Sequence, residues 1–373
     1  MQTQVIKLDA SKIDSAKIKE AAQLVEAGAL VAFPTETVYG IACRVKADSL
    51  KKLDSLKGRS PDKSYTLHIS QKTDVEKYVP TIALRAQKLI ENAWPGPLTI
   101  VFELDDKDIK KQKHSLEKEV FESLYKNNSI GIRCPDHPIA TQLLQAINYP
   151  VVAPSANITG KPPATDADQV LSQLEGQVEL LLDAGPCKYK KNSTVAKISK
   201  TGLEILRAGV YSQTELQAMA EVKFLFVCTG NTCRSPMAAE MFRKYLAEKL
   251  GCDLDQLDKK GYKIESAGTM GIIGAPASSE AIATCAAMRI DLTEHRSSAL
   301  SQPLIEESDL NFVMSQMHRQ QITALSPLAV DKCFLLAENQ DILDPIGQTQ
   351  QVYDNIAKLI EEAVKKRISE LVI

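Results

Sequence analysis

The sequence predicts an α/β protein built from two domains. Helix-type and strand-type patterns alternate along the chain, which favours parallel sheets covered by helices. At roughly 100–200 residues per domain, the 373 residues suffice for two such units. The alternation pauses at the polar residues 211–221 and then begins again. We therefore expect one domain over residues 1–212 and a second over residues 222–373.

The first domain begins with an amphipathic helix and a buried strand. Ile18, Ala22 and Val25 share one face of residues 15–27, and the glycine that follows ends the helix. The apolar run 29–33 is expected to be a strand, and it leads into a polar loop rich in hydroxyl groups. Later strands are expected over residues 99–104, 129–133, 151–153, 180–183 and 205–210, with a charged surface loop or exposed helix over 107–118.

The second domain repeats the alternation. Its first apolar strand, residues 223–227, runs into the loop 228–233 and then into a helix over residues 236–250. Further strands are expected over residues 262–267, 311–314 and 333–336, and further helices over 278–288 and 350–371.

Composition and charge exclude several functional classes. With 44% hydrophobic and 25% charged residues, the composition is typical of a globular protein. The apolar runs are too short to cross a bilayer and residues 1–20 hold no apolar signal segment, so we expect a cytoplasmic protein without a membrane partner. The net charge is +4 over residues 1–212 (29 Lys and Arg, 25 Asp and Glu) and −6 over residues 213–373 (16 and 22). Neither part is basic enough to predict a nucleic-acid clamp.

The loop after the first strand of the second domain carries the strongest chemical signal. In "CTGNTCRS", five residues separate Cys228 from Arg234. Successive backbone N–H groups in such a strand–loop–helix turn form a nest for an anion, and the helix dipole adds positive potential. Gly230 and Asn231 tolerate the positive φ that this curl needs. The expected nest consists of Thr229, Gly230, Asn231, Thr232 and Cys233.

The same loop predicts a nucleophile and a phosphate-binding side chain. A positive potential favours the thiolate form of Cys228, and the planar fork of Arg234 binds two phosphoryl oxygens. Ser235 is the candidate N-cap and Pro236 the first helical residue. Phosphoryl transfer also needs an acid for the leaving group, and Asp344, in the turn "DPIG", is the candidate.

These cysteines also allow two other interpretations. A zinc site is disfavoured because Cys228 and Cys233 form a lone C-x4-C without a second pair, so no metal is expected. A docking or redox-sensing module, in which Cys228 and Cys233 form a disulfide, stays open. The eight cysteines form no dense framework, and we expect mostly free thiols in the cytosol.

These segments resemble the low-molecular-weight protein tyrosine phosphatase family. The similarity runs from about residue 223 to the C-terminus and rests on "FVCTGNTCRSPMAAEMF", "SAGT", "DLTEHRSSAL" and "DP". It implies a Rossmann-like sheet of four parallel strands and hydrolysis of a phosphoprotein through a phosphocysteine, without a cofactor. By this resemblance Cys228 is the nucleophile, Arg234 the phosphate binder, Asp344 the general acid and Ser235 a hydrogen-bond donor to the thiolate.

Within that family the loop resembles the bacterial protein arginine phosphatases. Thr232 stands where tyrosine-specific members tend to have an aliphatic residue, and its hydroxyl could contact a guanidinium or orient a water. The resemblance therefore favours phosphoarginine over phosphotyrosine. Ile346 departs from it, because several arginine phosphatases have an aromatic residue there. Arsenate reductase is a third option within the fold, but Cys285 and Cys333 offer no obvious thiol relay.

Polar residues also gather at strand ends of the first domain. They lie in "PTETVYG", "KGRSPDKSYTLHI", "SIGIRCPDHP", "APSANITGKPP", "NSTV" and "LRAG". Ligands bind at strand ends in open α/β sheets, and several cations on one cavity would suit a polyphosphate and a carboxylate. The chain has no Walker loop and no GxGxxG motif, which excludes the two ordinary nucleotide-binding turns. The cations expected to converge are Lys57, Arg59, Lys63, Arg133 and Arg207.

This set resembles the YrdC/Sua5 family of threonylcarbamoyl-AMP synthases over about residues 18–211. The resemblance implies a twisted, open, mixed sheet with flanking helices. It also implies synthesis of threonylcarbamoyl-AMP from L-threonine, bicarbonate and ATP, with Mg²⁺ and with release of pyrophosphate. The product would feed the threonylcarbamoyl transferase machinery that modifies adenosine in tRNA. Double-stranded RNA binding belongs to the same implied functions.

The resemblance further implies which side chains meet the substrates. The threonine side consists of Thr35, His68, Arg133 and Ser193, and the ATP side of Lys57, Arg59, Lys63, Ser129, Ser155, Asn157 and Arg207. No side-chain nucleophile is needed, because the carbamate of threonine attacks the α-phosphorus and catalysis comes from positioning and charge neutralisation. The alternative is a nucleic-acid-binding module that has lost synthesis. We expect a bifunctional chain, in which a phosphatase replaces the second domain of longer family members.

Overall fold

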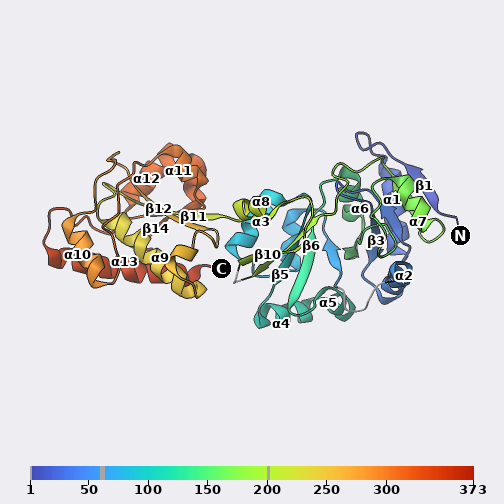
Figure 1. The fold of residues 1–373 in the computed structure, drawn as a ribbon, viewed down its shortest axis with the longest axis horizontal. Helices are drawn as coiled ribbons and strands as arrows, with labels where there is room; N and C mark the ends of the chain where they lie inside the picture. Colours follow the sequence, from blue (N-terminus) through green and yellow to red (C-terminus); the bar gives the residue numbers. More distant parts are fainter. Residues whose placement is uncertain (1, 59–63, 200–201) are drawn as a thin grey trace. The chain divides into compact units, whose positions relative to one another are not determined.

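The structure is a computed structural model that describes residues 2–58, 64–199 and 202–373 (Figure 1). The chain separates into two compact units, Met1–Ala220 and Glu221–Ile373. Each unit has its own sheet and its own apolar core. Across the described ranges, no helix combines the length and the apolar character needed to cross a membrane.

A mixed sheet forms the centre of the first unit. Its strands are β1 (Gln4–Lys7), β2 (Val31–Phe33), β3 (Gly40–Arg44), β4 (Thr66–His68), β5 (Leu98–Glu103), β6 (Ser129–Arg133), β7 (Val151–Val152), β8 (Leu180–Asp183), β9 (Thr194–Ser199) and β10 (Gly202–Arg207). Their order within the described residues is β1-β8-β2-β3-β7-β4-β6-β5-β9-β10. Strand β6 pairs with β4 in parallel and with β5 antiparallel. The mixed sheet that the resemblance implied is therefore confirmed.

Helices cover both faces of this sheet. They are α1 (Ser15–Glu26), α2 (Ala47–Lys57), α3 (Leu84–Ala93), α4 (Asp106–Ser115), α5 (Lys118–Leu124), α6 (Pro138–Ala146), α7 (Ala167–Leu174) and α8 (Gln213–Met219), with the 3₁₀ turn η1 (Lys72–Lys77). Val31 and Phe33 of β2 pack with residues of α1 and α6. Ala32, between them, belongs to the other core cluster. Both faces of β2 are buried because successive side chains of a strand point to opposite sides.

Several elements of the first unit differ from the sequence prediction. Of the two alternatives expected for residues 107–118, a loop and an exposed helix, the structure has the helix: residues 107–115 belong to α4, and Asp105 caps α4 by accepting a hydrogen bond from the N–H of Asp108. The closing strand expected over 205–210 is β10, which ends at Arg207. Beyond that end, Gly209 packs directly onto the start of β9, where a Cβ would lie 2.2 Å from the backbone nitrogen of Thr194. Strands β1, β3, β4 and β9 were not among those expected.

The second unit is a smaller parallel sheet between helices. Its strands are β11 (Val222–Cys228), β12 (Tyr262–Gly268), β13 (Leu310–Val313) and β14 (Cys333–Leu335), in the order β12-β11-β13-β14 with every pair parallel. The helices are α9 (Arg234–Leu250), α10 (Ser279–Ala287), α11 (Gln302–Glu307), α12 (Gln316–Leu325) and α13 (Gln350–Glu370), with the 3₁₀ turns η2 (Leu254–Gln256) and η3 (Pro327–Lys332). The implied four-stranded parallel sheet is confirmed.

Helix α9 begins two residues earlier than expected, with Cys233 at its N-cap and Arg234 as its first residue. Ser235 does not cap the helix. Its hydroxyl lies 3.0 Å from the sulfur of Cys228 and accepts a hydrogen bond from Asn231 Nδ2 at 2.9 Å. Ser235 therefore stabilises the preceding loop, and Pro236 lies in the first turn, where no intrahelical N–H bond is needed.

Candidate active sites

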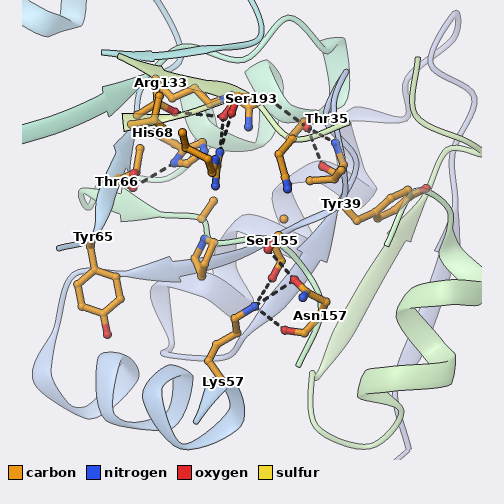
Figure 2. Close-up of a pocket in the computed structure, with 18 of the residues that line it drawn as sticks. Thr35, Tyr39, Lys57, Tyr65, Thr66, His68, Arg133, Ser155, Asn157 and Ser193 are labelled. Carbon is orange, nitrogen blue, oxygen red and sulfur yellow. Dashed lines mark hydrogen bonds between the residues drawn. The ribbon is translucent and has the colours of Figure 1, made fainter. Parts of the chain in front are cut away.

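A cavity of about 630 Å³ opens in the first unit (Figure 2). Its walls come from segments far apart in the sequence, including the end of α2, the loop after β2, and strands β4, β6, β9 and β10. Figure 2 shows two polar groups on opposite sides, one around Arg133 and one around Lys57. The lining contains the sequence-predicted residues Thr35, Lys57, His68, Arg133, Ser155, Asn157, Ser193 and Arg207.

Arg133, the last residue of β6, is held by buried oxygen atoms. Its Nη2 donates to Glu36 Oε1 at 2.8 Å and to the hydroxyls of Thr37 at 2.6 Å and Thr35 at 3.4 Å. The side chains of Arg133 and Glu36 are 8% and 2% exposed. The Nε of Arg133 is buried without a partner. An anion in the cavity, such as a carboxylate, would supply the missing acceptor.

His68 presents a second unpaired nitrogen in this group. Its Nδ1 lies 3.1 Å from the carbonyl oxygen of Thr66, whereas its Nε2 is buried without a partner. Burial, followed by the charge of Arg133, lowers the pKa of His68 to about 3, so the ring is neutral at neutral pH. The carbonyl of Thr66 requires the proton on Nδ1, which leaves Nε2 as an acceptor for a ligand hydroxyl or ammonium.

Arg207 lies beside the Arg133 group. Its Nη2 donates to the carbonyl oxygen of Ser193 at 2.8 Å and to Ser193 Oγ at 3.0 Å. Ser193 Oγ in turn lies 3.3 Å from Thr99 Oγ1. Burial, followed by the charge of Arg133, lowers the pKa of Arg207. The two guanidinium groups repel each other on one cavity wall. An anion bound beside them would offset this repulsion.

Lys57, the last residue of α2, forms the other polar group. Its Nζ donates to the carbonyl oxygen of Ser155 at 2.7 Å and to that of Asn157, and it lies 3.2 Å from Asn157 Oδ1. Ser155 Oγ donates to Asn157 Oδ1 at 2.6 Å. These bonds fix the loop after β7 against the end of α2 and place an ammonium on the cavity wall (Figure 2).

Of the residues assigned to the ATP side, Arg59 and Lys63 lie outside the described residues, and Ser129 does not line this cavity. Ser129 is the first residue of β6, at the opposite end from Arg133, and its hydroxyl donates to the carbonyl oxygen of Lys126 at 2.8 Å. A strand rises about 3.3 Å per residue, so the ends of β6 lie roughly 13 Å apart. The motif "SIGIR" therefore contributes its last residue to the cavity and not its first.

Sequence reasoning missed Glu36 and Thr66. Thr66 precedes His68 by two residues, and the strand period places both side chains on one face of β4. Glu36 is the acidic residue inside "PTETVYG", and its ion pair with Arg133 explains why a carboxylate stands among so many cations. Both signals were present in the sequence, but neither identifies its partner without the fold.

Replacing Glu36 by Gln is expected to destabilise the first unit. The change leaves the buried charge of Arg133 without its counter-ion, and removing one partner of a buried ion pair costs about 3–5 kcal/mol. Trp94 is the single Trp of the chain and lies in the core of the first unit, so its fluorescence during urea unfolding reports on that unit. Glu103→Gln is the matched control: its pair with Lys197 is 44% and 31% exposed, and its loss costs less than about 1 kcal/mol. Equal midpoints for the two variants would contradict the prediction.

In the second unit, the loop after β11 curls around the sulfur of Cys228. The backbone N–H of Asn231 donates to Sγ at 3.2 Å, and Ser235 Oγ lies 3.0 Å from it. Of the two residues expected to tolerate positive φ, Asn231 adopts it, at 55°. The Asn231 amide fixes the curl by donating to Ser266 Oγ at 2.8 Å and accepting from the N–H of Ser298 at 2.8 Å.

Gly268, in the segment "SAGT", allows this loop to lie against the end of β12. A Cβ on Gly268 would lie 2.8 Å from the carbonyl oxygen of Thr229 and 2.9 Å from the nitrogen of Asn231. Because these are backbone atoms of the loop, they cannot move aside without distorting it. Glycine is therefore the residue that fits this position.

Arg234 and Asp344 form an ion pair although they are 110 residues apart. The Arg234 side chain is 5% exposed and that of Asp344 37%. Arg234 Nη1 donates to the carbonyl oxygen of Ile342 at 3.0 Å and Nη2 to Thr229 Oγ1 at 3.0 Å, while Nε is buried without a partner. The site thus combines the thiol of the loop, a guanidinium with an unused donor and the carboxyl group of Asp344, which is a set that suits an oxyanion.

Thr232 and Cys233 complete the loop. Thr232 Oγ1 lies 3.3 Å from the position that a Cβ on Gly230 would take, and 3.6 Å from Cys233 Sγ. Cys233 is buried, with its sulfur 3.3 Å from the hydroxyl of Tyr353. Cys228 and Cys233 are both free thiols in the structure.

Exposed apolar side chains flank the loop. Ile272 Cδ1 lies 3.8 Å from the same Cβ position on Gly230. Leu343 and Ile346, on either side of Asp344, are exposed large hydrophobic residues. An apolar rim of this kind suits the carbon atoms of a phosphorylated side chain.

Comparisons with known proteins match the two units separately. Residues 23–209 match the Sua5/YciO/YrdC family model, described as "Telomere recombination". Residues 223–372 match the family model of low molecular weight phosphotyrosine protein phosphatases.

Curated relatives and a solved structure match the first unit's family. Threonylcarbamoyl-AMP synthase of Bacillus subtilis is 33% identical over 204 residues, 54% of this chain and 56% of that protein. A putative threonylcarbamoyl-AMP synthase of Mycobacterium tuberculosis is 34% identical over 196 residues, 52% of this chain and 85% of that protein. The structure of a mutated Sua5 of Pyrococcus abyssi aligns with a TM-score of 0.50 and 25% identity, over 71% of this chain and 92% of that one. This chain spans 56% of the B. subtilis relative and 66% of a P. abyssi threonylcarbamoyl-AMP synthase.

Proposed function

Residues 23–209 belong to the Sua5/YciO/YrdC family and residues 223–372 to the low-molecular-weight phosphatase family, and from this we propose that the chain is a bifunctional enzyme. The first unit forms threonylcarbamoyl-AMP from L-threonine, bicarbonate and ATP. The second hydrolyses a phosphoprotein through a phosphocysteine. The observation that carries the first activity is the pair of unpaired buried nitrogens, Arg133 Nε and His68 Nε2, on one polar cavity.

In the proposed synthesis, threonine binds with its carboxylate on Arg133 and its hydroxyl or amine at His68 Nε2. The amine adds to the CO₂ derived from bicarbonate, which gives a carbamate and releases one proton. A carbamate oxygen then attacks the α-phosphorus of ATP, and pyrophosphate leaves. Arg207, which contacts Ser193 next to Arg133, neutralises charge where the two substrates meet. Lys57, with the loop of Ser155 and Asn157, faces the remaining phosphates.

A resident metal site is not part of this proposal. Within the described ranges, no group of three or more His, Cys, Asp or Glu side chains could hold a metal ion. Glu36, beside the cavity, is already paired with Arg133. Mg²⁺ therefore enters with the ATP phosphates, as it commonly does at nucleotide sites. We further propose a cytoplasmic enzyme whose product passes to the transferase that modifies tRNA; the eight free thiols support a reducing compartment.

Release of pyrophosphate from ATP tests the first activity. We expect it to require threonine and bicarbonate together, because the nucleophile forms from both. Salt-dependent RNA binding without any threonine-dependent pyrophosphate release would instead support a nucleic-acid-binding module.

In the proposed phosphatase reaction, the Cys228 thiolate attacks the phosphorus of a phosphorylated side chain. Arg234 Nε and Nη2 and the backbone N–H groups of the loop bind the phosphoryl oxygens, so the substrate takes the place of Asp344 on Nη2. Asp344, freed from Arg234 and protonated from solvent, gives its proton to the leaving atom. Water then attacks the phosphocysteine, Asp344 accepts its proton, and inorganic phosphate leaves with Cys228 restored.

Thr232 is the proposed determinant of substrate preference, with phosphoarginine favoured over phosphotyrosine. We expect kcat/KM to be higher for a phosphoarginine peptide than for the matched phosphotyrosine peptide, with Cys228→Ser as the blank. Thr232→Ile removes the hydroxyl that would contact the guanidinium. The ratio of kcat/KM for phosphoarginine to that for phosphotyrosine should therefore fall by about tenfold or more, so that phosphotyrosine becomes the preferred substrate. A preference for phosphotyrosine in the unaltered chain would contradict the substrate assignment and would leave the phosphatase activity itself standing.

A further inference from the structure

A fully buried histidine connects helix α12 to the phosphate loop, which is the segment of residues 228–233. His318 lies in the first turn of α12, which follows β13, and none of its surface is exposed. Strand β13 pairs in parallel with β11, and the N–H of Met314 donates to the carbonyl oxygen of Val227 at 3.1 Å. Parallel strands end at the same edge of a sheet, so the start of α12 lies next to the loop that holds Cys228.

His318 uses both ring nitrogens in hydrogen bonds. Nδ1 lies 2.8 Å from the hydroxyl of Ser315, the N-cap of α12. Nε2 lies 3.0 Å from Thr229 Oγ1. The same Thr229 oxygen accepts a hydrogen bond from Arg234 Nη2 at 3.0 Å. A continuous chain of hydrogen bonds therefore runs from Ser315 through His318 and Thr229 to Arg234.

The protonation state of His318 is compatible with both of these hydrogen bonds. Burial, followed by the charge of Arg234, lowers the pKa of His318 to about 4, against the opposing effect of Asp344 and Asp341. The ring is therefore neutral at neutral pH, with one donor and one acceptor nitrogen. In either tautomer the bond to His318 leaves Thr229 Oγ1 a lone pair for Arg234, which is a donor only.

We propose that His318 is a positioning residue for Arg234, acting through the hydroxyl of Thr229. Arg234 Nη2 donates both to Thr229 and to Asp344, so its guanidinium can be drawn toward either. Without His318 the Thr229 hydroxyl is free to rotate, and Arg234 is held by Asp344 instead of facing the nucleophile. The proposal rests on the phosphatase activity proposed above.

A double-mutant cycle on the full chain tests the proposal, with turnover of p-nitrophenyl phosphate as the readout. We expect His318→Leu and Thr229→Val each to lower kcat/KM by about tenfold, the loss of one hydrogen bond to a charged group. In the Thr229→Val background, His318→Leu should cause no further loss, because it acts through the missing hydroxyl. His318→Gln, which reaches the position of Nε2, and Thr229→Ser, which keeps the hydroxyl, should retain most of the activity.

Equal losses from His318→Leu in both backgrounds would overturn the proposal and show a role in packing alone. Thermal unfolding checks that each variant is folded. If His318→Leu is not, the cycle is run with His318→Asn, which keeps the contact to Ser315 and loses that to Thr229. An unaltered chain without turnover that depends on Cys228 would instead refute the phosphatase activity, so the two failures are distinguishable.

Discussion

Cys228→Ser is expected to abolish phosphatase turnover and to leave threonylcarbamoyl-AMP formation unchanged. The serine hydroxyl is far less acidic than a thiol and cannot supply the anionic nucleophile, and loss of a nucleophile removes more than about a thousandfold of the rate. Neither the sheet nor the core of the first unit contains Cys228. Both rates are measured on one preparation: hydrolysis of p-nitrophenyl phosphate reports the phosphatase, and threonine-dependent pyrophosphate release reports threonylcarbamoyl-AMP formation.

Cys252→Ser is the matched control for this experiment. Cys252 is a free, partly exposed thiol just beyond the C-terminal end of α9, whereas the phosphate loop precedes the N-terminal end of that helix. A helix of this length spans about 25 Å, so this thiol is remote from the loop and both activities should persist. If Cys228→Ser keeps its phosphatase turnover, or loses both activities while still folded, the division of functions between the units is wrong.

The other buried thiols show why context could single out Cys228. Cys43, Cys134, Cys187 and Cys285 are buried free thiols that belong to no such loop. The sulfur of Cys228 accepts a hydrogen bond from the N–H of Asn231 and lies beside Ser235. All three residues fall within eight positions of the chain. A local motif of that kind is readable from the sequence, because the loop that forms it is short.

Contacts between distant segments were less predictable. Asp344 was named from its turn and from the resemblance, and only the structure shows that it pairs with Arg234. Thr229 and His318 are 89 residues apart, and nothing in either segment alone indicates the pairing. Ser129 shows that the reverse also holds. It belongs to the same motif as Arg133, but the two residues lie at opposite ends of β6, so closeness in sequence did not mean closeness in the cavity.

The same limit applies to the fold. Long periodic segments such as α1 and α13 were predicted within about two residues, because one apolar face repeats over several turns. A short strand such as β4 has three residues, which is too few for a period to appear. Its place in the sheet depends on pairing with β6 and β7, which is tertiary information.

Arg207→Ala is expected to slow threonylcarbamoyl-AMP formation strongly and to leave the phosphatase intact. Arg207 lies on the exposed end of β10 and contacts the chain through Ser193, so its removal should not unfold the first unit, and Trp94 fluorescence checks this. It faces the cavity next to Arg133, and loss of a charge-assisted hydrogen bond to an anion costs about 1.5–3 kcal/mol, or roughly 10- to 150-fold in kcat/KM. Arg207→Lys keeps the charge without the planar fork, so its kcat/KM for synthesis should lie between those of the unaltered chain and Arg207→Ala. Full synthesis by Arg207→Ala would mean that Arg133 and Lys57 suffice to bind the anionic substrates, and that the bound anion does not lie against β10.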